Sequence, residues 1–134
     1  MVKQIFINLP VSNLKKSMSF FTKLGFKFNK QFTDKNAACM IIGNNIYSML
    51  IVKKRFNDFT KKGIINARKN VEVINSLQLS TKKEVDAITL KAKKAGALLT
   101  KSSDYGWMYQ KGFEDPDGHL WEVFWMNPKG IPKN

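Results

Sequence analysis

Hydrophobic and polar positions in the first half of the chain predict one helix among four strands. Over residues 4–11 apolar and polar side chains alternate, as they do in a half-buried strand. Apolar residues then recur at helical spacing from Leu14 to Leu24, with Asn13 as the predicted N-cap and Gly25 just past the last turn. Three further apolar runs predict strands over residues 26–32, 37–42 and 46–52. The expected order of elements is β-α-β-β-β.

The same order of elements returns in the second half. Residues 72–80 predict a strand, and Thr81 with Glu84 three positions later forms a capping box that begins a helix. That helix is expected to end at Gly96, which lies 96 − 25 = 71 positions after Gly25. The strands predicted after it cover residues 97–102, 107–113 and 120–125. An internal repeat of about 70 residues is therefore predicted from the order of elements.

We expect a single domain over residues 1–134 that contains both series. Its first module covers residues 3–52, a connection covers 53–70, a second module covers 71–127, and a flexible tail covers 128–134. The connection is polar and basic, but Phe56, Phe59, Ile64 and Ile65 indicate short helical pieces that pack on an apolar surface. The tail is rich in Pro, Gly and Lys, which is typical of a mobile chain end.

The amino-acid composition excludes several classes of functional site. The 134 residues include one Cys and one His, so a single chain can form neither an internal disulfide nor a Cys- or His-rich metal site. We expect Cys39, which has apolar neighbours, to be a buried and inert thiol. No apolar run is long enough for a secretory signal or a membrane span. These features predict a cytoplasmic protein with no membrane partner.

The charge of the chain is strongly positive and has three interpretations. Lys and Arg number 23 against 10 Asp and Glu, which gives a net charge of +13. Arginine reads phosphates and bases in a bidentate manner, and its restriction to Arg55 and Arg68 weakens the case for DNA, so nucleic acid is the least favoured of the three interpretations. A joint excess of Lys and Asn is also typical of a biased source genome. The third interpretation is an anionic small-molecule ligand. A cationic protein attracts anions and repels cationic ligands at long range.

The sharpest local motif is a tight turn followed by an apolar strand. Residues 115–119 read Asp-Pro-Asp-Gly-His, in which each residue type suits a chain reversal. On the strand that follows, Glu122 is the one carboxylate in an apolar run, and it shares a face with Leu120 and Phe124. A buried carboxylate costs several kcal/mol unless it is paired or bound to a metal. The turn alone predicts a hairpin, whereas Glu122 is a candidate catalytic residue.

These features together resemble the vicinal-oxygen-chelate superfamily, which includes glyoxalase I, extradiol dioxygenases, fosfomycin resistance enzymes and bleomycin resistance proteins. The resemblance covers residues 3–127 and rests on the two βαβββ modules, the helix end at residues 24–26, and the turn before Glu122. Within the superfamily, the chain most resembles small bacterial proteins described as predicted lactoylglutathione lyases. The resemblance implies an α+β fold, a U-shaped sheet around a cavity, and a homodimer.

Metal-dependent members of that superfamily place one ligand on the first and last strand of each module. By resemblance, those four positions fall on Phe6, Met49, Ile74 and Glu122. Only Glu122 carries a group that binds a hard or borderline cation. A set on one face, Asn8 and Gln78 with Glu122, offers one carboxylate and two amides, which is a poor metal site. We therefore expect no metal and no other cofactor, with a divalent metal kept as the alternative.

The cavity implied by the resemblance is expected to be lined by polar and aromatic strand residues. The second module also has a concentration of aromatic residues, for which core and dimer packing is the other interpretation; these are Trp107, Tyr109, Trp121 and Trp125. The candidates for the lining are Phe6, Asn8, Ser48, Met49, Ile74, Ser76, Gln78, Tyr109 and Phe124.

Three functions follow from these residues. The first is a small-molecule binding protein that works without the metal of the superfamily, with an anionic ligand as one option. The second is a glyoxalase-type lyase or isomerase that uses Glu122 as a base or metal ligand. The third, argued from charge alone, is a protein associated with nucleic acid. The resemblance favours the first two.

Overall fold

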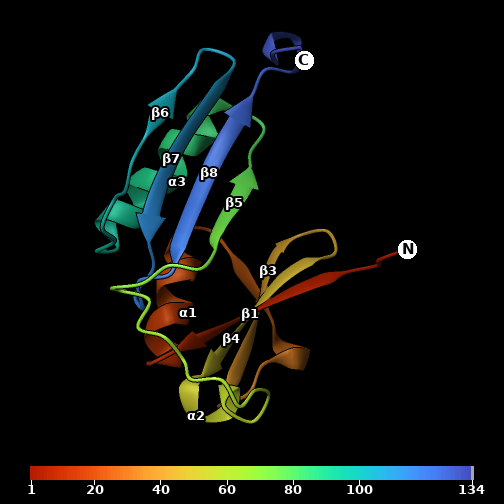
Figure 1. Cartoon of the computed structure of the whole chain (residues 1–134), viewed down its shortest axis with the longest axis vertical. Coiled ribbons are helices and arrows are strands. Elements are labelled where there is room, and N and C mark those ends of the chain that lie inside the picture. The colour runs from red at the N-terminus through yellow and green to blue at the C-terminus, as the bar shows by residue number, and fades with distance from the viewer. Residues whose placement is uncertain (134) are drawn as a thin grey trace. The chain divides into compact units, whose positions relative to one another are not determined.

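The computed structural model describes residues 1–133 and contains two compact units, Met1–Asn66 and Ala67–Asn134 (Figure 1). We call them unit 1 and unit 2. Each unit holds one four-stranded mixed sheet with a helix packed on it. The α+β class and the two repeated modules predicted from the sequence are confirmed.

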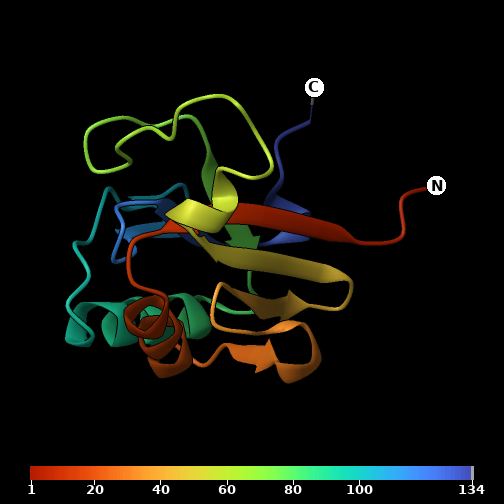
Figure 2. The same cartoon turned by 90° about the horizontal axis from the view of Figure 1, so that it is seen from below.

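In unit 1 the sheet has the strand order β1-β4-β3-β2. Strands β1 and β4 are parallel, and the other neighbours are antiparallel. Figure 2 shows the four strands in this order, from β1 in red to β2 in orange. The elements of unit 1 are β1 (Ile5–Val11), α1 (Leu14–Lys23), β2 (Lys27–Asn29), the 3-10 turn η1 (Lys30–Phe32), β3 (Ala37–Gly43), β4 (Ile46–Val52) and α2 (Lys53–Phe56).

Unit 2 repeats this topology with the strand order β5-β8-β7-β6. Its first and last strands, β5 and β8, are again parallel neighbours. Figure 1 shows α3 behind β7 and β8. The elements of unit 2 are β5 (Ile74–Gln78), α3 (Lys82–Lys94), β6 (Ser103–Asp104), β7 (Met108–Glu114), β8 (Leu120–Met126) and the 3-10 turn η2 (Pro128–Gly130).

Both main helices begin and end where their capping residues predict. The Asn13 side chain accepts a hydrogen bond from the Lys16 amide at 3.0 Å, and the Thr81 hydroxyl accepts one from the Glu84 amide at 3.1 Å. Each helix is followed by a glycine with a positive φ, at residues 25 and 96. These local bonds satisfy backbone groups that a helix end leaves free.

Each unit has its own core between the helix and one face of the sheet. In unit 1, Phe20 and Phe21 of α1 are buried with strand residues such as Leu50. In unit 2, Val85 of α3 is fully buried, as is Val123 of β8. Burial of a side chain of this size contributes about 1.5–3 kcal/mol. The second face of each sheet, turned away from the helix, we call the distal face.

Two predicted strands are wrong in their extent. The strand expected over residues 26–32 ends at Asn29, because the Asn29 side chain accepts the Gln31 amide at 3.0 Å and the Thr33 hydroxyl donates to the Asn29 carbonyl at 2.7 Å. These bonds turn the chain into η1. The strand expected over residues 97–102 is one bridge from Leu99 to Phe113, and pairing resumes one residue out of register at β6. An extra residue of this kind is a bulge, which interrupts the ladder.

The connection and the chain end each contain a short helical segment. Helix α2 is the one helical piece found in the predicted connection, and after it Arg55 pairs with Asp58 at 2.8 Å and lies over the Phe59 ring at 4.6 Å. In the expected tail over residues 128–134, η2 is held by an Asn127 cap, while Asn134 lies outside the described residues. None of the helices in residues 1–133 has the length and apolar character of a membrane span.

Candidate functional site

The strand register decides which candidate residues share a face in unit 1. Asn8 pairs with Met49 and Phe6 pairs with Tyr47, so all four side chains lie on the distal face. The Phe6 and Tyr47 rings stack, with centroids 4.7 Å apart and planes 14° from parallel. Three predicted lining residues, Phe6, Asn8 and Met49, are therefore brought together on one surface.

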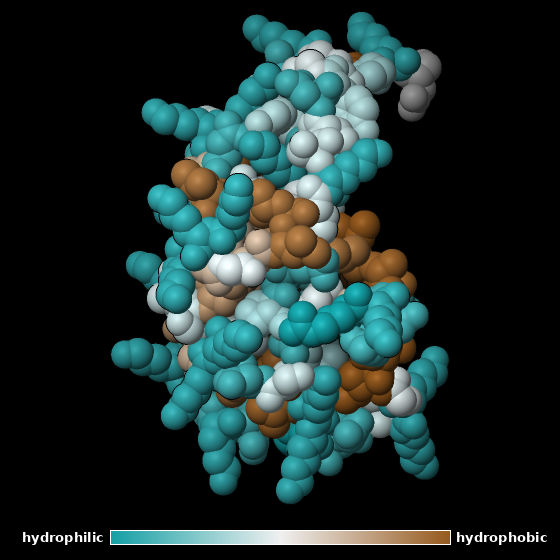
Figure 3. Space-filling view, turned by 90° about the vertical axis from the view of Figure 1, so that its left-hand side faces the viewer, coloured by the Kyte–Doolittle hydropathy of each residue, from teal (hydrophilic) through white to brown (hydrophobic). Residues whose placement is uncertain are grey.

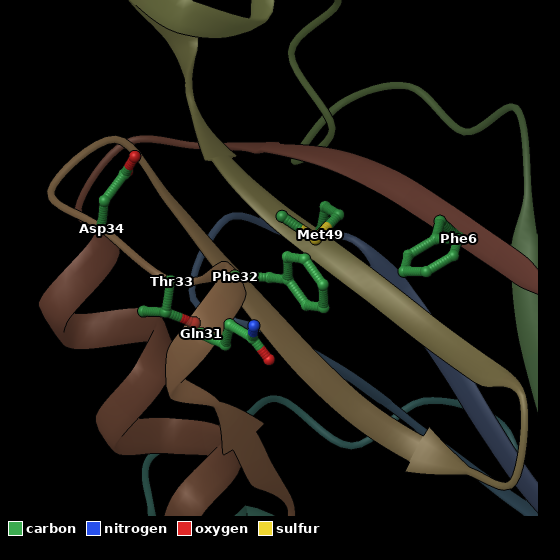
Figure 4. Close-up of a pocket in the computed structure, with 6 residues that line it drawn as sticks. All are labelled: Phe6, Gln31, Phe32, Thr33, Asp34 and Met49. Atoms are coloured by element: carbon green, nitrogen blue, oxygen red, sulfur yellow. The ribbon is translucent and has the colours of Figure 1, made fainter.

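A pocket of about 300 Å³ lies on this distal face (Figure 4). In Figure 4 the Phe6 side chain comes from β1, Met49 from β4, and Phe32 from η1, with Met49 close to the Phe32 ring. Phe32 is 59% exposed and Phe6 is 44% exposed. The residues that line the pocket are Phe6, Gln31, Phe32, Thr33, Asp34 and Met49.

Two polar residues at the pocket are already engaged in holding its wall. The Thr33 hydroxyl accepts the Cys39 amide at 3.0 Å and donates to the Asn29 carbonyl. The Asp34 carboxylate accepts the amides of Asn36 and Ala37 at 2.8 and 3.0 Å, and these bonds lower the pKa of Asp34. In Figure 4 that carboxylate points away from the apolar side chains. The Gln31 carboxamide is the polar side chain left at the pocket.

The sequence interpretation missed the segment over residues 31–34, which it placed in or just beyond a strand. The sequence does contain a signal for a turn here, because Asn29 and Asp34 both belong to residue types that favour local turns. An apolar Phe32 between such turn formers has no neighbouring strand to pack against and is free to face a pocket.

In unit 2 the distal face carries Glu122 at its centre. Ser76 pairs with Glu122 across β5 and β8, and its hydroxyl donates to Glu122 Oε1 at 2.9 Å. Phe124, two residues along, lies between Gln78 on β5 and Gln110 on β7. Ile74 lies on the same face, opposite Leu120. Five predicted residues, Glu122 among them, thus share this surface.

Two predicted lining residues lie on the helix-facing side of their sheets instead. Ser48 is buried, and its hydroxyl donates to the Ile7 carbonyl at 2.9 Å. Tyr109 donates to Asp86 Oδ1 of α3 at 2.6 Å, and Lys111 contacts the same oxygen at 2.7 Å. The bond from Lys111 lowers the pKa of Asp86, and Asp86 in turn raises the pKa of Lys111. The cause is strand alternation, since neighbours such as Ser48 and Met49 face opposite sides.

The turn at residues 115–119 forms the predicted hairpin around a buried carboxylate. Asp115 Oδ1 accepts the amides of Asp117 and His119 at 2.9 and 3.0 Å, and Oδ2 accepts the Trp121 indole at 3.1 Å. Burial raises the pKa of the Asp115 carboxyl, against the opposing effects of His119 and these donors. Arg68 donates to the Pro116 carbonyl. The turn therefore fixes β8, which carries Glu122.

Cys39 is buried on β3, as the sequence indicates for an inert thiol. It pairs with Met49 of β4, and desolvation raises the pKa of its thiol. A raised pKa keeps the sulfur in its less reactive, protonated form.

The donor groups do not fit the metal site of the superfamily. Of the four positions, unit 1 supplies Phe6 and Met49, and unit 2 supplies Ile74 and Glu122. Aromatic and aliphatic side chains have no lone pair for a metal, and a thioether favours soft ions. Across residues 1–133, no three His, Cys, Asp or Glu side chains lie together as a metal site requires. No metal-dependent step is therefore assigned to this chain.

Positive charge is distributed unevenly between the units. Unit 1 has 12 basic and 2 acidic residues, a net charge of +10, and unit 2 has 11 basic and 8 acidic residues, a net charge of +3. All the basic side chains of unit 1 are exposed. Hydrophilic side chains cover most of the face shown in Figure 3, with apolar residues between them.

Comparison with known proteins places this fold in one family. The family model "Glyoxalase/Bleomycin resistance protein/Dioxygenase superfamily" matches residues 3–123. A hypothetical protein of S. aureus, SA1046, is 31% identical, with 92% of this chain and 94% of that chain covered and a TM-score of 0.77. The comparison with curated proteins gave no match.

Two more distant structures share the fold. TnmS3, an antibiotic binding protein from Streptomyces sp. CB03234, is 16% identical over 95% of this chain and 98% of that chain, with a TM-score of 0.69. The fosfomycin resistance protein FosX from Listeria monocytogenes is 17% identical over 96% and 97%, with a TM-score of 0.71. With a family model that spans most of its length, this chain belongs to the Glyoxalase/Bleomycin resistance protein/Dioxygenase superfamily.

Proposed function

We propose that this protein binds a small aromatic molecule in the pocket of unit 1 and does so without a metal. The observation that carries the proposal is the pocket itself, of about 300 Å³, whose apolar wall includes Phe6 and Met49. By resemblance, these are two of the positions where metal-dependent relatives hold their ligands. A wall of rings and a thioether suits an aromatic ligand, because such surfaces stack and are polarisable.

The charge of unit 1 favours an anionic ligand. A net charge of +10 on a unit with exposed lysines attracts anions over the Debye length and repels cations. The one carboxylate at the pocket, Asp34, points away from its apolar wall. We therefore propose an aromatic anion as the class of ligand.

The relatives support the binding of small molecules as a general role. TnmS3 is described as an antibiotic binding protein, and FosX as a fosfomycin resistance protein. The proposal also includes a homodimer, which the resemblance favours, and a cytoplasmic location, which a single buried thiol favours. Sedimentation of the purified chain measures the mass of the assembly.

Titration with naphthalene-2-sulfonate tests the pocket. The metal-depleted chain is expected to bind this probe more tightly than neutral 2-naphthol at low salt, and the difference is expected to vanish at high salt. Phe32→Ala is expected to weaken binding about tenfold, because it removes an aromatic contact of roughly 1–1.5 kcal/mol. Calorimetry measures both affinities.

Phe59→Ala is the matched control for that variant. Phe59 is 60% exposed and Phe32 is 59% exposed, but Phe59 does not line the pocket. The proposal fails if the two variants bind the probe equally well, or if binding requires added Ni, Zn, Mn or Fe(II).

A second candidate function is a lyase or isomerase of glyoxalase type with Glu122 as general base. The observation in its favour is the Ser76 hydrogen bond, which holds one carboxylate oxygen at 2.9 Å and leaves the other for a substrate proton. Turnover of a glutathione hemithioacetal that falls at least about a hundredfold in Glu122→Gln is expected from such a base. Absence of turnover in the unsubstituted chain rejects this candidate.

A further inference from the structure

We infer that the aromatic anion bound on the distal face of unit 1 is a nucleotide, either free or within a single-stranded nucleic acid. This inference rests on the proposed function, because it assigns a ligand to the same pocket. Three features of unit 1 support it: a stacked aromatic pair on one face of the sheet, one carboxamide that holds no part of the pocket wall, and few carboxylates.

The aromatic side chains provide surfaces on which a base can stack. Tyr47 stacks on Phe6 with centroids 4.7 Å apart, so the Phe6 ring is held in one orientation at the pocket. Phe32, which lies close to Met49, is more than half exposed (Figure 4). Exposed rings on a β-sheet face are the usual means by which proteins stack the bases of single strands.

Gln31 provides the group that can read a base edge. Its backbone amide donates to Asn29 Oδ1, and its side chain reaches the pocket. A carboxamide offers a donor and an acceptor side by side, which suits the edge of adenine. The neighbouring Thr33 and Asp34 already use their side chains to hold the wall, so hydrogen bonding to the base falls to Gln31.

The positive charge of unit 1 favours the binding of a phosphate group. The two units have nearly equal numbers of lysines, 11 and 10, but 2 and 8 carboxylates respectively. A genome-wide excess of lysine would account for the even distribution of lysines but would leave the scarcity of carboxylates in unit 1 unexplained. Both carboxylates there are engaged, Asp58 with Arg55 and Asp34 with backbone amides. Lys30 and Lys35 flank the lining segment and are exposed.

The scarcity of arginine points to a single strand or a free nucleotide as the source. Specific reading of a duplex groove relies on bidentate arginine contacts, and unit 1 has Arg55 alone, which is paired with Asp58. Stacking and lysine contacts need no groove and tolerate many sequences. A duplex is therefore expected to bind less tightly than a single strand of the same length.

The test compares AMP, a fluorescent single-stranded oligoadenylate and its duplex on the full chain. Anisotropy and calorimetry are expected to show binding of AMP or of the single strand. Phe6→Ala and Phe32→Ala are expected to weaken it by at least about fivefold, the effect of losing one stacked base. Phe59→Ala is expected to leave it unchanged, and circular dichroism confirms that each variant is folded.

The outcomes separate this inference from the proposed function. Binding of AMP identifies a free nucleotide as a sufficient ligand, and binding of the single strand alone identifies the polymer; both support the inference. If naphthalene-2-sulfonate binds in a Phe32-dependent manner and neither AMP nor the strand binds, the inference is overturned and the proposed function stands. Equal affinity of all three variants, or tighter binding of the duplex, assigns the interaction to charge alone and also overturns it.

Discussion

Replacement of Asp115 by alanine is expected to lower the free energy of unfolding by about 3 kcal/mol. Three N–H groups would lose their acceptor, namely the amides of Asp117 and His119 and the indole of Trp121. Each buried donor left without a partner costs about 1–3 kcal/mol, and water can reach the two partly buried amides. The value of about 3 kcal/mol therefore lies at the low end of their sum. Urea unfolding followed by tryptophan fluorescence measures the change.

Two further variants identify the cause of that loss. Asp115→Asn keeps an acceptor for the two amides but turns an amide donor toward the Trp121 indole, so its loss is expected to lie between zero and that of alanine. Asp104 is exposed and accepts one amide, that of Gly106, at 2.9 Å. Asp104→Ala is expected to cost no more than about 0.5–1 kcal/mol. Equal losses at residues 104 and 115 would contradict the account given for Asp115.

Gly118→Ala is expected to cost about 2–3 kcal/mol, because the new Cβ has neither a suitable backbone nor space. Gly118 has φ +90°, which L side chains rarely adopt, and an added Cβ would lie 2.9 Å from the N, Cα and Cγ atoms of Arg68. Backbone atoms cannot rotate away as a side-chain end does. The segment around Arg68 must therefore move off the turn or the turn must open. The same urea experiment measures the loss.

Gly106 separates the two causes at Gly118. It has φ +82° and no heavy atom within 4 Å of an added Cβ. Gly106→Ala is thus expected to report the backbone cost alone, about 1 kcal/mol. If Gly118→Ala costs no more than this, then the close approach of Arg68 contributes nothing to stability.

The parts of the fold that sequence predicts well are those set by local chemistry. Asn13 and Thr81 mark helix starts, Gly25 and Gly96 mark helix ends, and each acts through bonds within a few residues of itself. The internal repeat could be predicted because both modules show the same series of helix-start and helix-end residues. The early end of the strand predicted over residues 26–32 has the opposite cause. Asn29 bonds its own neighbours there and overrides an apolar pattern that alone favours a strand.

The candidate site could be predicted only as far as strand alternation allows. Glu122, Ser76 and Phe124 share a face because period two places them there. By the same rule, adjacent Ser48 and Met49 cannot both line one cavity, and the hydroxyl of Ser48 is buried on the helix side. Gln31 and Phe32 required knowledge of how η1 leaves the sheet. That path depends on Thr33 reaching Cys39 on β3, a contact that no local pattern encodes.

The order of strands within each sheet has a consequence for how the chain folds as it is synthesised. In both units the strand made last is central, with β4 between β1 and β3 and β8 between β5 and β7. The first strand of a unit has no partner until its last strand emerges, and contacts such as Ile7 to Ser48 close loops of 41 residues. Such non-local pairing is slow, and edges stay open to other chains until it is complete. Each unit therefore passes through one vulnerable interval during translation, which ends when β4 or β8 leaves the ribosome.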